Sequence, residues 1–545
     1  MREPDSRPHP IWVVLGAATV VFHLGLIFYG LTPALISRPL HMALVLPWIL
    51  IFAARTPFER ASGGLLTALG VAACGFIAFN EEALANQYGF IDTPFQMLVG
   101  VFLVFLALET ARRAIGWPLP LVALLALLYA ALGEHIPGRF GHPGLPMPSL
   151  VGTLTITEGG LWGTLTGVSV GVVAIFVIFG AVLNAGEAGR GFMNIAGALA
   201  GRLTGGAAKV SVISSALMGS ISGSASANVA STGAITIPSM VRLGYPRALA
   251  GAVEAVASSG GQIMPPLMGA GAFVMVELTG TPYTEIMAAA MLPALLYFAT
   301  VWFGINAYAT RHDLSPLAEA DRPGRREVVV TSLFFAVPFV ILLERIFFGG
   351  YTPQYAASLA VFAGLALLAF DVTLSFSLRG FAARLAEAML TAGRQVAVIG
   401  AIIICASLVI GVLSITGLGV KITSGILSLS GEMLWPALLL TALACLVLGM
   451  EVPTTAAYVI CVSVAGPALT ALGLEPLLAH LFVFWFALLS TITPPVCGGV
   501  FIAAGMVGEN WLRVAFKAMA LGIGLYIIPL AMVANPEIIR LGADP

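Results

Sequence analysis

The chain has 545 residues, of which 59% are hydrophobic and 9% charged, and its formal net charge at pH 7 is −1. Its mean hydropathy of +1.00 and its recurrent apolar runs of about 20 residues exclude a soluble globular protein. They predict an all-α polytopic membrane protein embedded in a lipid bilayer. The charged residues form no basic patch, so no nucleic-acid partner is expected. The five cysteines lie in apolar segments without metal-ligand spacing, which indicates buried apolar side chains.

Apolar runs divide the first part of the chain. Residues 1–10 are polar and no small-residue cleavage site follows, so residues 11–30 are predicted to be a retained first span and not a signal peptide. Further spans are predicted at residues 40–54, 61–79, 94–111 and 118–132. An amphipathic segment at 150–166, a span at 168–183 and a short amphipathic arm at 192–203 follow.

The remainder of the chain contains two hairpins and two interrupted spans. After a hairpin at 210–238 come a broken span at 248–275, a span at 286–308, a charged loop at 311–327 and spans at 328–343 and 355–370. A second arm at 381–390 is expected to be separate from the next span, at 395–413. The last predicted elements are a helix at 418–429, a hairpin at 434–469, a broken span at 477–506 and a span near 514–533. Five segments result: 1–116, 117–167, 168–310, 311–394 and 395–545.

Two distant regions of the chain are built to the same plan. Gly219 precedes Pro265 by 46 positions, and Gly449 precedes Pro494 by 45. Each region contains a polar hairpin, then a Leu-Gly pair, and then a Pro-Pro pair. Non-helical backbone at membrane depth must line a cavity or be buried in protein. Within a duplicated unit, a polar hairpin followed by a broken span is typical of a transporter binding site.

The distribution of Lys and Arg predicts the topology. Alternating the first five spans puts the arginines of three segments on one side, which the positive-inside rule makes cytoplasmic; these are Arg2, Arg7, Arg55, Arg60, Arg112 and Arg113. The N-terminus is then cytoplasmic and the C-terminus periplasmic. The two hairpins enter from opposite faces, as an inverted repeat requires.

Polar residues at the hairpins are candidate ligands for substrate and ion. Helix N-termini suit a carboxylate, and free carbonyls with hydroxyls suit a small cation. The alternative for any single serine is close helix packing. The candidates at the first hairpin are Ser220, Ser222, Ser224, Asn228 and Thr232, and those at the second are Pro453, Thr454 and Thr455.

The interruptions of the two broken spans offer the same chemistry. Proline removes a hydrogen-bond donor and clashes with the preceding turn, so a Pro-Pro pair frees carbonyls just before it. The hairpin tips and these breaks are therefore expected to hold the coupling ion, with Na⁺ bound by oxygen ligands. The candidates are Ser259, Gly260, Gln262, Pro265 and Pro266 in the first break, and Thr491, Thr493, Pro494 and Pro495 in the second.

Two titratable residues in apolar surroundings leave alternatives open. An intramembrane carboxylate costs roughly 2.5–3.5 kcal/mol, which makes Glu254 a candidate proton site. Alternatively, it is a structural residue near the interface, paired with Arg247. His480 is either a hydrogen-bonded structural residue or a proton relay.

Long motifs resemble a known family. The stretch from Gly219 to Met275, PTTAAYV at 453–459 and AHLFVFWFALLSTITPPV at 479–496 resemble the large permease subunit of tripartite ATP-independent periplasmic (TRAP) transporters. The resemblance runs from about Glu109 to Val533 and is closest to the TAXI-type subgroup, in which small and large subunits are fused. Residues 1–116 resemble the small subunit in the number and position of their spans. Glu451 departs from the pattern, which has a small or apolar residue there.

The resemblance implies an elevator-type transporter of the bacterial inner membrane. It would import an organic anion delivered by a periplasmic TAXI-type solute-binding protein, driven by a Na⁺ or H⁺ gradient and without another cofactor. One alternative is a stand-alone dicarboxylate symporter of similar build that needs no binding protein. A more remote one is an intramembrane serine hydrolase using His480, although the sequence has no GxSxG motif.

Overall fold

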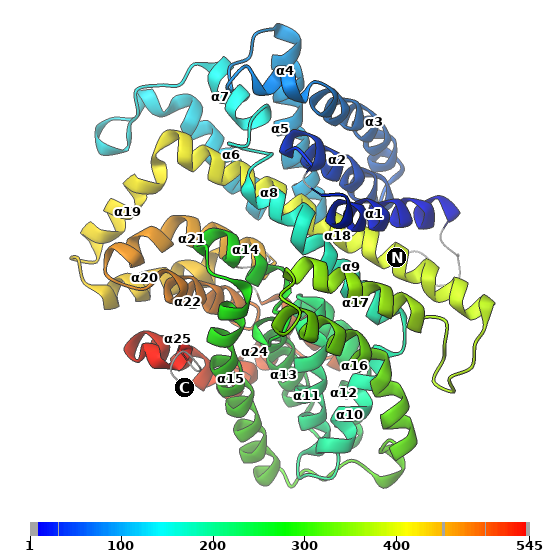
Figure 1. The fold of residues 1–545 in the computed structure, drawn as a ribbon. Helices are drawn as coiled ribbons and strands as arrows, with labels where there is room; N and C mark the ends of the chain where they lie inside the picture. Colours follow the sequence, from blue (N-terminus) through cyan, green and yellow to red (C-terminus); the bar gives the residue numbers. More distant parts are fainter. Residues whose placement is uncertain (1–8, 31, 450–452, 496, 541–545) are drawn as a thin grey trace. The chain divides into compact units, whose positions relative to one another are not determined.

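The computed structural model describes residues 9–30, 32–449, 453–495 and 497–540, except the side chains of Ser222 and Ala320. In these ranges the regular elements are helices, with one isolated bridge between Phe370 and Phe376 (Figure 1). Ten of the described helices are long and apolar enough to cross a membrane, or eleven if a pair bent by 45° counts as one span. The prediction of an all-α polytopic membrane protein is confirmed.

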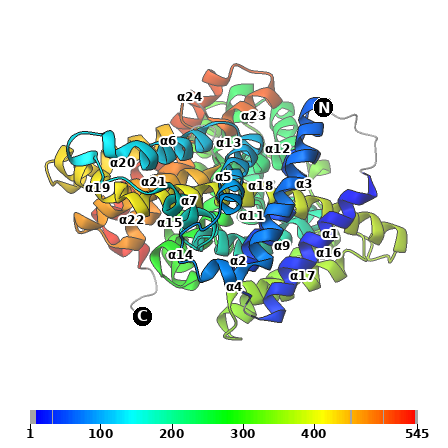
Figure 2. The ribbon, with the colours of Figure 1, turned by 90° about the horizontal axis from the view of Figure 1, so that it is seen from above.

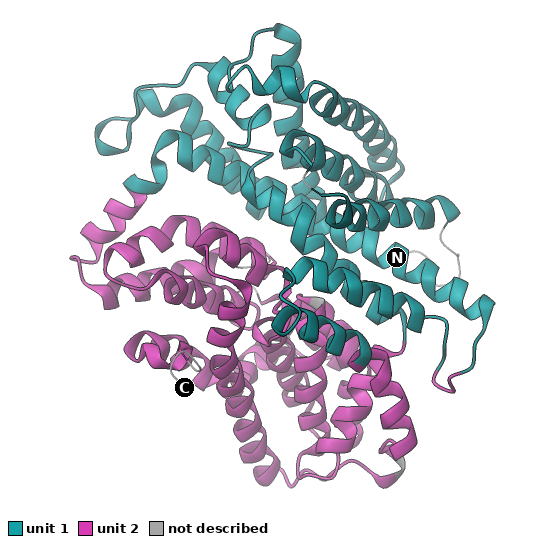
Figure 3. Cartoon of the chain, in the orientation of Figure 1, with its two compact units in different colours: residues 1–186, 337–371, 375–421 teal, residues 187–336, 372–374, 422–545 magenta. Residues whose placement is uncertain are grey.

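The chain forms two compact units, each assembled from separate stretches of sequence (Figure 3). Unit 1 comprises residues 1–186, 337–371 and 375–421, and unit 2 comprises residues 187–336, 372–374 and 422–545. Both predicted hairpins and both predicted breaks lie in unit 2.

Unit 1 contains the N-terminal helices and the longest helix of the described chain. Its third helix begins at a capping box, in which the Thr56 side chain and the Glu59 side chain each bond the other residue's backbone N–H. The helices of unit 1 are α1 (Pro10–Tyr29), α2 (Ala34–Pro47) with a π-helical turn (Trp48–Phe52), α3 (Pro57–Phe79), α4 (Glu81–Ala85), α5 (Pro94–Ile115), α6 (Pro118–Leu132), α7 (Met147–Thr155), α8 (Thr164–Val168), a π-helical turn (Ser169–Val173), α9 (Ala174–Ala185), the second half of α16 (Arg325–Phe347), α17 (Pro353–Leu367), α18 (Leu378–Thr416) and the start of α19 (Leu418–Leu429).

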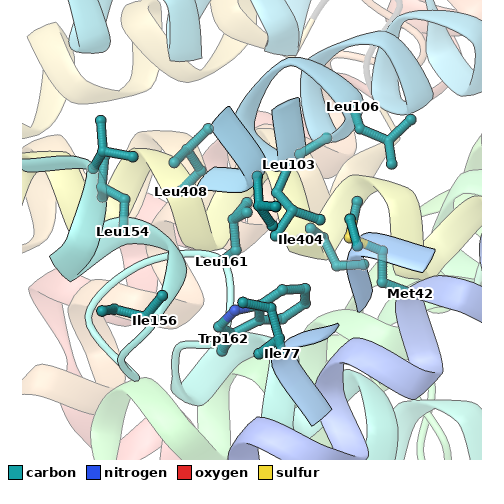
Figure 4. Packing of buried hydrophobic residues seen from close by; sticks show 14 of the residues in the cluster. Met42, Ile77, Leu103, Leu106, Leu154, Ile156, Leu161, Trp162, Ile404 and Leu408 are labelled. Atoms are coloured by element: carbon teal, nitrogen blue, oxygen red, sulfur yellow. The ribbon is translucent and has the colours of Figure 1, made fainter. Parts of the chain in front are cut away.

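Buried side chains from α5, α7 and α18 form one core of unit 1 (Figure 4). Trp162 lies among them and is fully buried, and its indole nitrogen donates to the Thr155 carbonyl at 2.6 Å. Ser407 of α18 donates to the Gly160 carbonyl at 2.7 Å. These two hydrogen bonds hold the turn between α7 and α8 against α18, where the sequence predicted a continuous amphipathic segment at 150–166.

Two buried histidines connect α1, α2 and the π-helical turn before α9. His23 Nδ1 lies 2.7 Å from the Thr19 carbonyl, His23 Nε2 lies 2.8 Å from His41 Nδ1, and His41 Nε2 lies 3.1 Å from Ser169 Oγ. A carbonyl accepts only, so in neutral rings His23 carries its proton on Nδ1 and His41 does likewise. Ser169 then donates to His41, and every polar atom of this buried chain has a partner.

The separation of an arm at 381–390 from a span at 395–413 is wrong. Residues Leu378–Thr416 form one helix of 39 residues, so the predicted boundary between 394 and 395 falls inside α18. The intervening residues contain no proline, and a single glycine does not end a helix. Gly393 instead permits close packing, since a Cβ there would lie 2.3 Å from the Trp48 ring.

Unit 2 contains two successions of four helices in the same order. The hairpin of α11 and α12 precedes the broken pair α13 and α14, and the hairpin of α20 and α21 precedes the broken pair α22 and α23. The helices of unit 2 are α10 (Ala188–Ala200), α11 (Gly206–Ser222), α12 (Ala225–Arg242), α13 (Arg247–Gly260) with a 3₁₀ turn (Gly261–Ile263), α14 (Gly269–Thr279), α15 (Tyr283–Arg311), the first half of α16, the remainder of α19, α20 (Leu434–Leu448), α21 (Thr454–Ala471), α22 (Pro476–Leu489), α23 (Gly498–Val507), α24 (Trp511–Leu521) and α25 (Ile523–Ala534).

The breaks in α13–α14 and α22–α23 confirm the predicted interruptions at the Pro-Pro pairs. The first hairpin turns at Gly223, whose φ of +59° is the left-handed conformation that glycine adopts without strain. Helix α13 packs against α11, α12, α23 and α24, and α12 also packs against α23 (Figure 2). Two helices of the first succession, α12 and α13, therefore pack directly on α23 of the second.

Candidate functional site

Glu254 lies in the middle of α13 and is fully buried. Five hydroxyl groups surround its carboxyl group. Ser211 donates to Oε2 at 2.7 Å, and Ser258 donates to Oε1 at 3.1 Å. The remaining donors are Thr232 to Oε1, Thr236 to Oε2 and Ser215 to Oε1. We call Glu254 and these five residues the Glu254 cluster.

The cluster is built from pairs of polar residues spaced four apart on three neighbouring helices. Ser211 and Ser215 lie on α11, Thr232 and Thr236 on α12, and Glu254 and Ser258 on α13. Residues at i and i+4 share one face of a helix, so each pair points in one direction. The three helices pack against each other, and the three pairs meet between them.

No positive side chain neutralises Glu254. Among the ion pairs of the described residues, none includes this carboxylate, so the predicted alternative of a pair with Arg247 is wrong. A buried carboxylate without a cationic partner is costly, and hydroxyls supply only part of the lost solvation. The arrangement thus favours a bound cation, either a proton on the carboxyl group or an ion held by carboxylate and hydroxyl oxygens.

Asn228 holds the same three helices together. It is fully buried, and its amide nitrogen donates to the Ser215 carbonyl of α11 at 2.9 Å and to the Ser258 carbonyl of α13 at 3.3 Å. Both amide protons are therefore used within the protein. The amide oxygen lies 3.5 Å from Thr232 Oγ1, which connects Asn228 to the Glu254 cluster.

The two broken spans meet through a pair of hydroxyls. Ser259 Oγ, in the last turn of α13, lies 2.7 Å from Thr491 Oγ1, which follows α22. Thr493 Oγ1, two residues later, donates to the Leu489 carbonyl at 2.7 Å and lies 2.6 Å from Tyr526 Oη. These predicted site residues are thus fixed by contacts within unit 2.

Equivalent positions of the two successions make equivalent close approaches. A Cβ on Gly261 would lie 2.4 Å from Gly219 Cα, so the 3₁₀ turn crosses α11 backbone to backbone. Ser490 takes the place of Gly261, four residues before the second Pro-Pro pair, and its hydroxyl donates to the Gly449 carbonyl at 3.1 Å. The same pairing of hairpin and break therefore occurs twice.

The N-termini of several helices converge beside the breaks. A Cβ on Gly269, at the start of α14, would lie 2.7 Å from Gly223 Cα at the tip of the first hairpin. A Cβ on Gly498, at the start of α23, would lie 3.6 Å from Ser226 Oγ near the start of α12. Helix α14 also packs on α21. Helix N-termini carry free N–H groups and partial positive charge, so this region can hold an anion.

The other predicted site residues are not all joined to the Glu254 cluster. Ser220 donates to the Leu217 carbonyl of its own helix, and Ser224 accepts from the Ala227 N–H as the N-cap of α12. Thr454 is buried and Thr455 half-buried at the start of α21, after Pro453, and no side-chain hydrogen bond joins either threonine to the cluster. Gly260, Gln262 and Pro265 are buried in the first break, Pro266 is half-buried there, and both Pro-Pro bonds, 265–266 and 494–495, are cis. The Ser222 side chain and Glu451 lie outside the described residues.

His480 is placed as a structural residue. Its Nδ1 lies 2.7 Å from Tyr458 Oη, and the two rings pack edge to face. Among the described side chains, no hydrogen bond joins His480 to a serine, as the nucleophile and base of a serine hydrolase would require.

The second succession lacks the equivalent of the Glu254 cluster. Glu254 lies 11 positions before Pro265, and Val483 lies 11 positions before Pro494. Ser215 lies four positions before Gly219, and Cys445 lies four positions before Gly449. The thiols of Cys445 and Cys461 are in hydrogen-bonding contact. Among the described residues, the position of Glu254 is thus occupied by a buried carboxylate in the first succession and by a valine in the second.

Sequence reasoning missed Ser211, Ser215, Thr236 and Tyr526. The first three belong to pairs spaced four apart, and this spacing in apolar helices is the signal that finds them. Tyr526 lies 33 residues from Thr493, and no local pattern connects the two.

Comparison with known proteins agrees with these observations. Residues 102–545 match the model of the family described as tripartite ATP-independent periplasmic transporter, DctM component. The chain is 28% identical over 345 residues to the C4-dicarboxylate TRAP transporter large permease protein DctM of Pseudomonas aeruginosa, covering 62% of this chain and 77% of that protein. It is 25% identical over 431 residues to the isethionate TRAP transporter permease protein DctMQ of Oleidesulfovibrio alaskensis (77% and 66%). It is 24% identical over 361 residues to the sialic acid TRAP transporter large permease protein SiaM of Vibrio cholerae (66% and 82%).

The family match covers most of the chain and includes both hairpins and both breaks. Its start at residue 102 leaves α1 to α4 outside the match. The matched family consists of membrane transport proteins and not of enzymes, in agreement with the position of His480. The chain belongs to the DctM family of tripartite ATP-independent periplasmic transporter permeases.

Proposed function

We propose that this chain is the permease of a secondary active importer in the bacterial inner membrane. It takes an organic anion from a periplasmic solute-binding protein of the TAXI type and moves the anion inward with an ion gradient. The family match supports an acidic substrate, and so do the substrates for which the relatives are named, which are C4-dicarboxylate, isethionate and sialic acid. Helices α1 to α4 correspond to a small permease subunit that is fused to the large one.

The observation that supports ion-coupled transport is the environment of Glu254. Glu254 is fully buried among five hydroxyls, and no cationic side chain of the described residues forms an ion pair with it. A proton neutralises this carboxyl group without requiring more ligands, and the hydroxyls then reorient to accept its hydrogen bond. We therefore propose H⁺ as the coupling ion, with Na⁺ at the same oxygens as the alternative.

The anion is proposed to bind where helix N-termini converge. The starts of α12 and α14 meet at Gly223 and Gly269, and the start of α23 lies beside Ser226. An anionic group there accepts hydrogen bonds from free backbone N–H groups. The Ser259–Thr491 pair lies at the ends of α13 and α22, where the two broken spans are interrupted.

The conformational change is proposed to be of the elevator type. Unit 2 contains both hairpins, both breaks and the Glu254 cluster, so it is the unit that would carry substrate. The repeated order of its helices supports an inverted repeat, with the N-terminus of the chain cytoplasmic and the C-terminus periplasmic.

Reconstituted transport tests this proposal. The purified permease would be placed in proteoliposomes with the cognate binding protein and the labelled organic acid that stabilises that binding protein in a thermal-shift screen. We expect concentrative uptake only when binding protein and a pH gradient are both present. Saturable uptake without binding protein would favour the stand-alone symporter. Uptake driven by Na⁺ alone would identify Na⁺, and not H⁺, as the coupling ion.

A further inference from the structure

Two adjoining cavities in unit 2 reach the Glu254 cluster from one side. The first has a volume of about 360 Å³ and is lined by Thr236, Ser239 and Arg242 of α12, together with residues of α10 and the 311–327 loop. The second has a volume of about 350 Å³ and is lined by Thr232 and Ser231 of α12 and by Ser214 of α11.

The same four residues line both cavities, so the two spaces are neighbours. These residues are Met193, Asn194, Ile235 and Glu327. At the outer side, Glu327 is exposed and accepts a hydrogen bond from the Asn194 amide at 3.3 Å. Each cavity has room for on the order of ten water molecules, and each has polar partners for them.

One threonine in the wall of each cavity contacts the buried carboxyl group. Thr236 lines the first cavity and donates to Glu254 Oε2, whereas Thr232 lines the second and donates to Oε1. A threonine hydroxyl can accept a hydrogen bond from water while it donates its own proton. Both carboxyl oxygens are thus within one proton transfer of a cavity wall.

We propose that these two cavities are the aqueous route by which protons enter and leave Glu254 on the side of α10 and the 311–327 loop. This inference rests on the proposed proton coupling and adds its pathway. A hydronium ion in the cavity gives a proton to the oxygen of Thr232 or Thr236, and that hydroxyl releases its original proton to Glu254. One O–H bond breaks and one forms at the threonine, which is regenerated. The arginines of this side, among them Arg190, Arg242 and Arg322, make it the expected cytoplasmic face.

The cavity walls themselves include Asp321 and Glu327. On the described helices packed against α13, no charged side chain forms an ion pair with Glu254. The charged or titratable groups on the helices packed against α13 are engaged elsewhere or lie at helix ends. Two lysines lie over aromatic rings: Lys209 of α11 over Trp302, and Lys517 of α24 over Tyr308. Two arginines form ion pairs: Arg242 of α12 with Asp321, and Arg513 of α24 with Glu509. His480 of α22 contacts Tyr458, and Glu285 and Arg311 lie at the ends of α15.

The route can be tested without substrate, by infrared detection of hydrogen–deuterium exchange on the full-length protein in detergent. At a pH where Glu254 is protonated, its carboxyl C=O band shifts on transfer to D₂O, and Glu254→Gln assigns the band by removing it. To block the cavities reversibly, a cysteine is introduced by Ile235→Cys and then modified. The five native cysteines, which are all buried, are first replaced by alanine so that only residue 235 reacts. A bulky thiosulfonate adduct at this position fills both cavities, and dithiothreitol removes it. The matched control is Leu199→Cys, because Leu199 on α10 is 65% exposed and lines neither cavity.

We expect the adduct at residue 235 to slow the band shift at least tenfold, dithiothreitol to restore it, and the adduct at residue 199 to change nothing. Exchange that is unaffected by the adduct at 235 would overturn the route while leaving the proton on Glu254 in place. A spectrum without any band that Glu254→Gln removes would overturn both the route and the proposed proton site. Uptake driven by Na⁺ alone, in the transport assay above, would refute the proposed coupling independently of these exchange rates.

Discussion

Ser259 Oγ lies 2.7 Å from Thr491 Oγ1, although 232 residues separate the two in the chain. This hydrogen bond joins the last turn of α13 to the break after α22. It connects the copy of the framework that contains Glu254 to the copy that has Val483 at the equivalent position. Ser259 precedes the first Pro-Pro pair by six residues and Thr491 precedes the second by three, so the hydrogen bond links the two interruptions.

The Ser259–Thr491 contact is expected to couple the two breaks energetically. Ser259→Ala and Thr491→Val should each reduce transport, and a double-mutant cycle on thermal stability in detergent should give a coupling energy of about 0.6 kcal/mol, with ~1.7 kcal/mol as an upper value. Ser463→Ala is the matched control, because Ser463 bonds only to the Val459 carbonyl of its own helix. Strictly additive single effects would show that the contact contributes nothing.

Asn228 is predicted to stabilise the packing of α11, α12 and α13 as well as to be a site residue. Asn228→Asp retains the size and one oxygen but loses both donors to the Ser215 and Ser258 carbonyls. Leaving buried polar groups unpaired costs about 1–3 kcal/mol, so the variant should unfold at a lower temperature or denaturant concentration. Wild-type stability together with lost transport would instead make Asn228 a ligand without a structural role.

The glycine contact between the 3₁₀ turn and α11 should not tolerate a methyl group. Gly261→Ala places a Cβ 2.4 Å from Gly219 Cα, and such overpacking costs about 1–3 kcal/mol. Gly505→Ala is the matched comparison, since nothing lies within 4 Å of its added Cβ. Within a helix this change should be neutral or stabilising by up to about 1 kcal/mol. Equal thermal stability of the two variants would refute the close approach.

The sequence predicted the framework because proline, glycine and polar residues interrupt apolar runs at matched spacings. Both hairpins and both breaks follow from these local rules, and so does the position of Glu254 in an apolar helix. The sequence did not predict α18 as one helix, since Gly393 could equally mark a break until Trp48 is seen packed against it. Nor did it predict the partners of Glu254, which come from three helices whose packing only the structure gives. Thr454 and Thr455, at the start of α21, form no described hydrogen bond with the Glu254 cluster, and their role as site residues stays a prediction.

The most direct test of the account concerns Glu254→Gln in proteoliposomes that contain the binding protein and its ligand. Glutamine keeps the size and most hydrogen bonds of the side chain but cannot release a proton. With an inside-alkaline pH gradient and no Na⁺, the wild-type protein and the control Glu285→Gln should accumulate solute. Glu254→Gln should fail to accumulate solute while still exchanging it across the membrane at equal concentrations. Accumulation by Glu254→Gln equal to that of the wild-type protein would contradict the assignment of Glu254 as the coupling site.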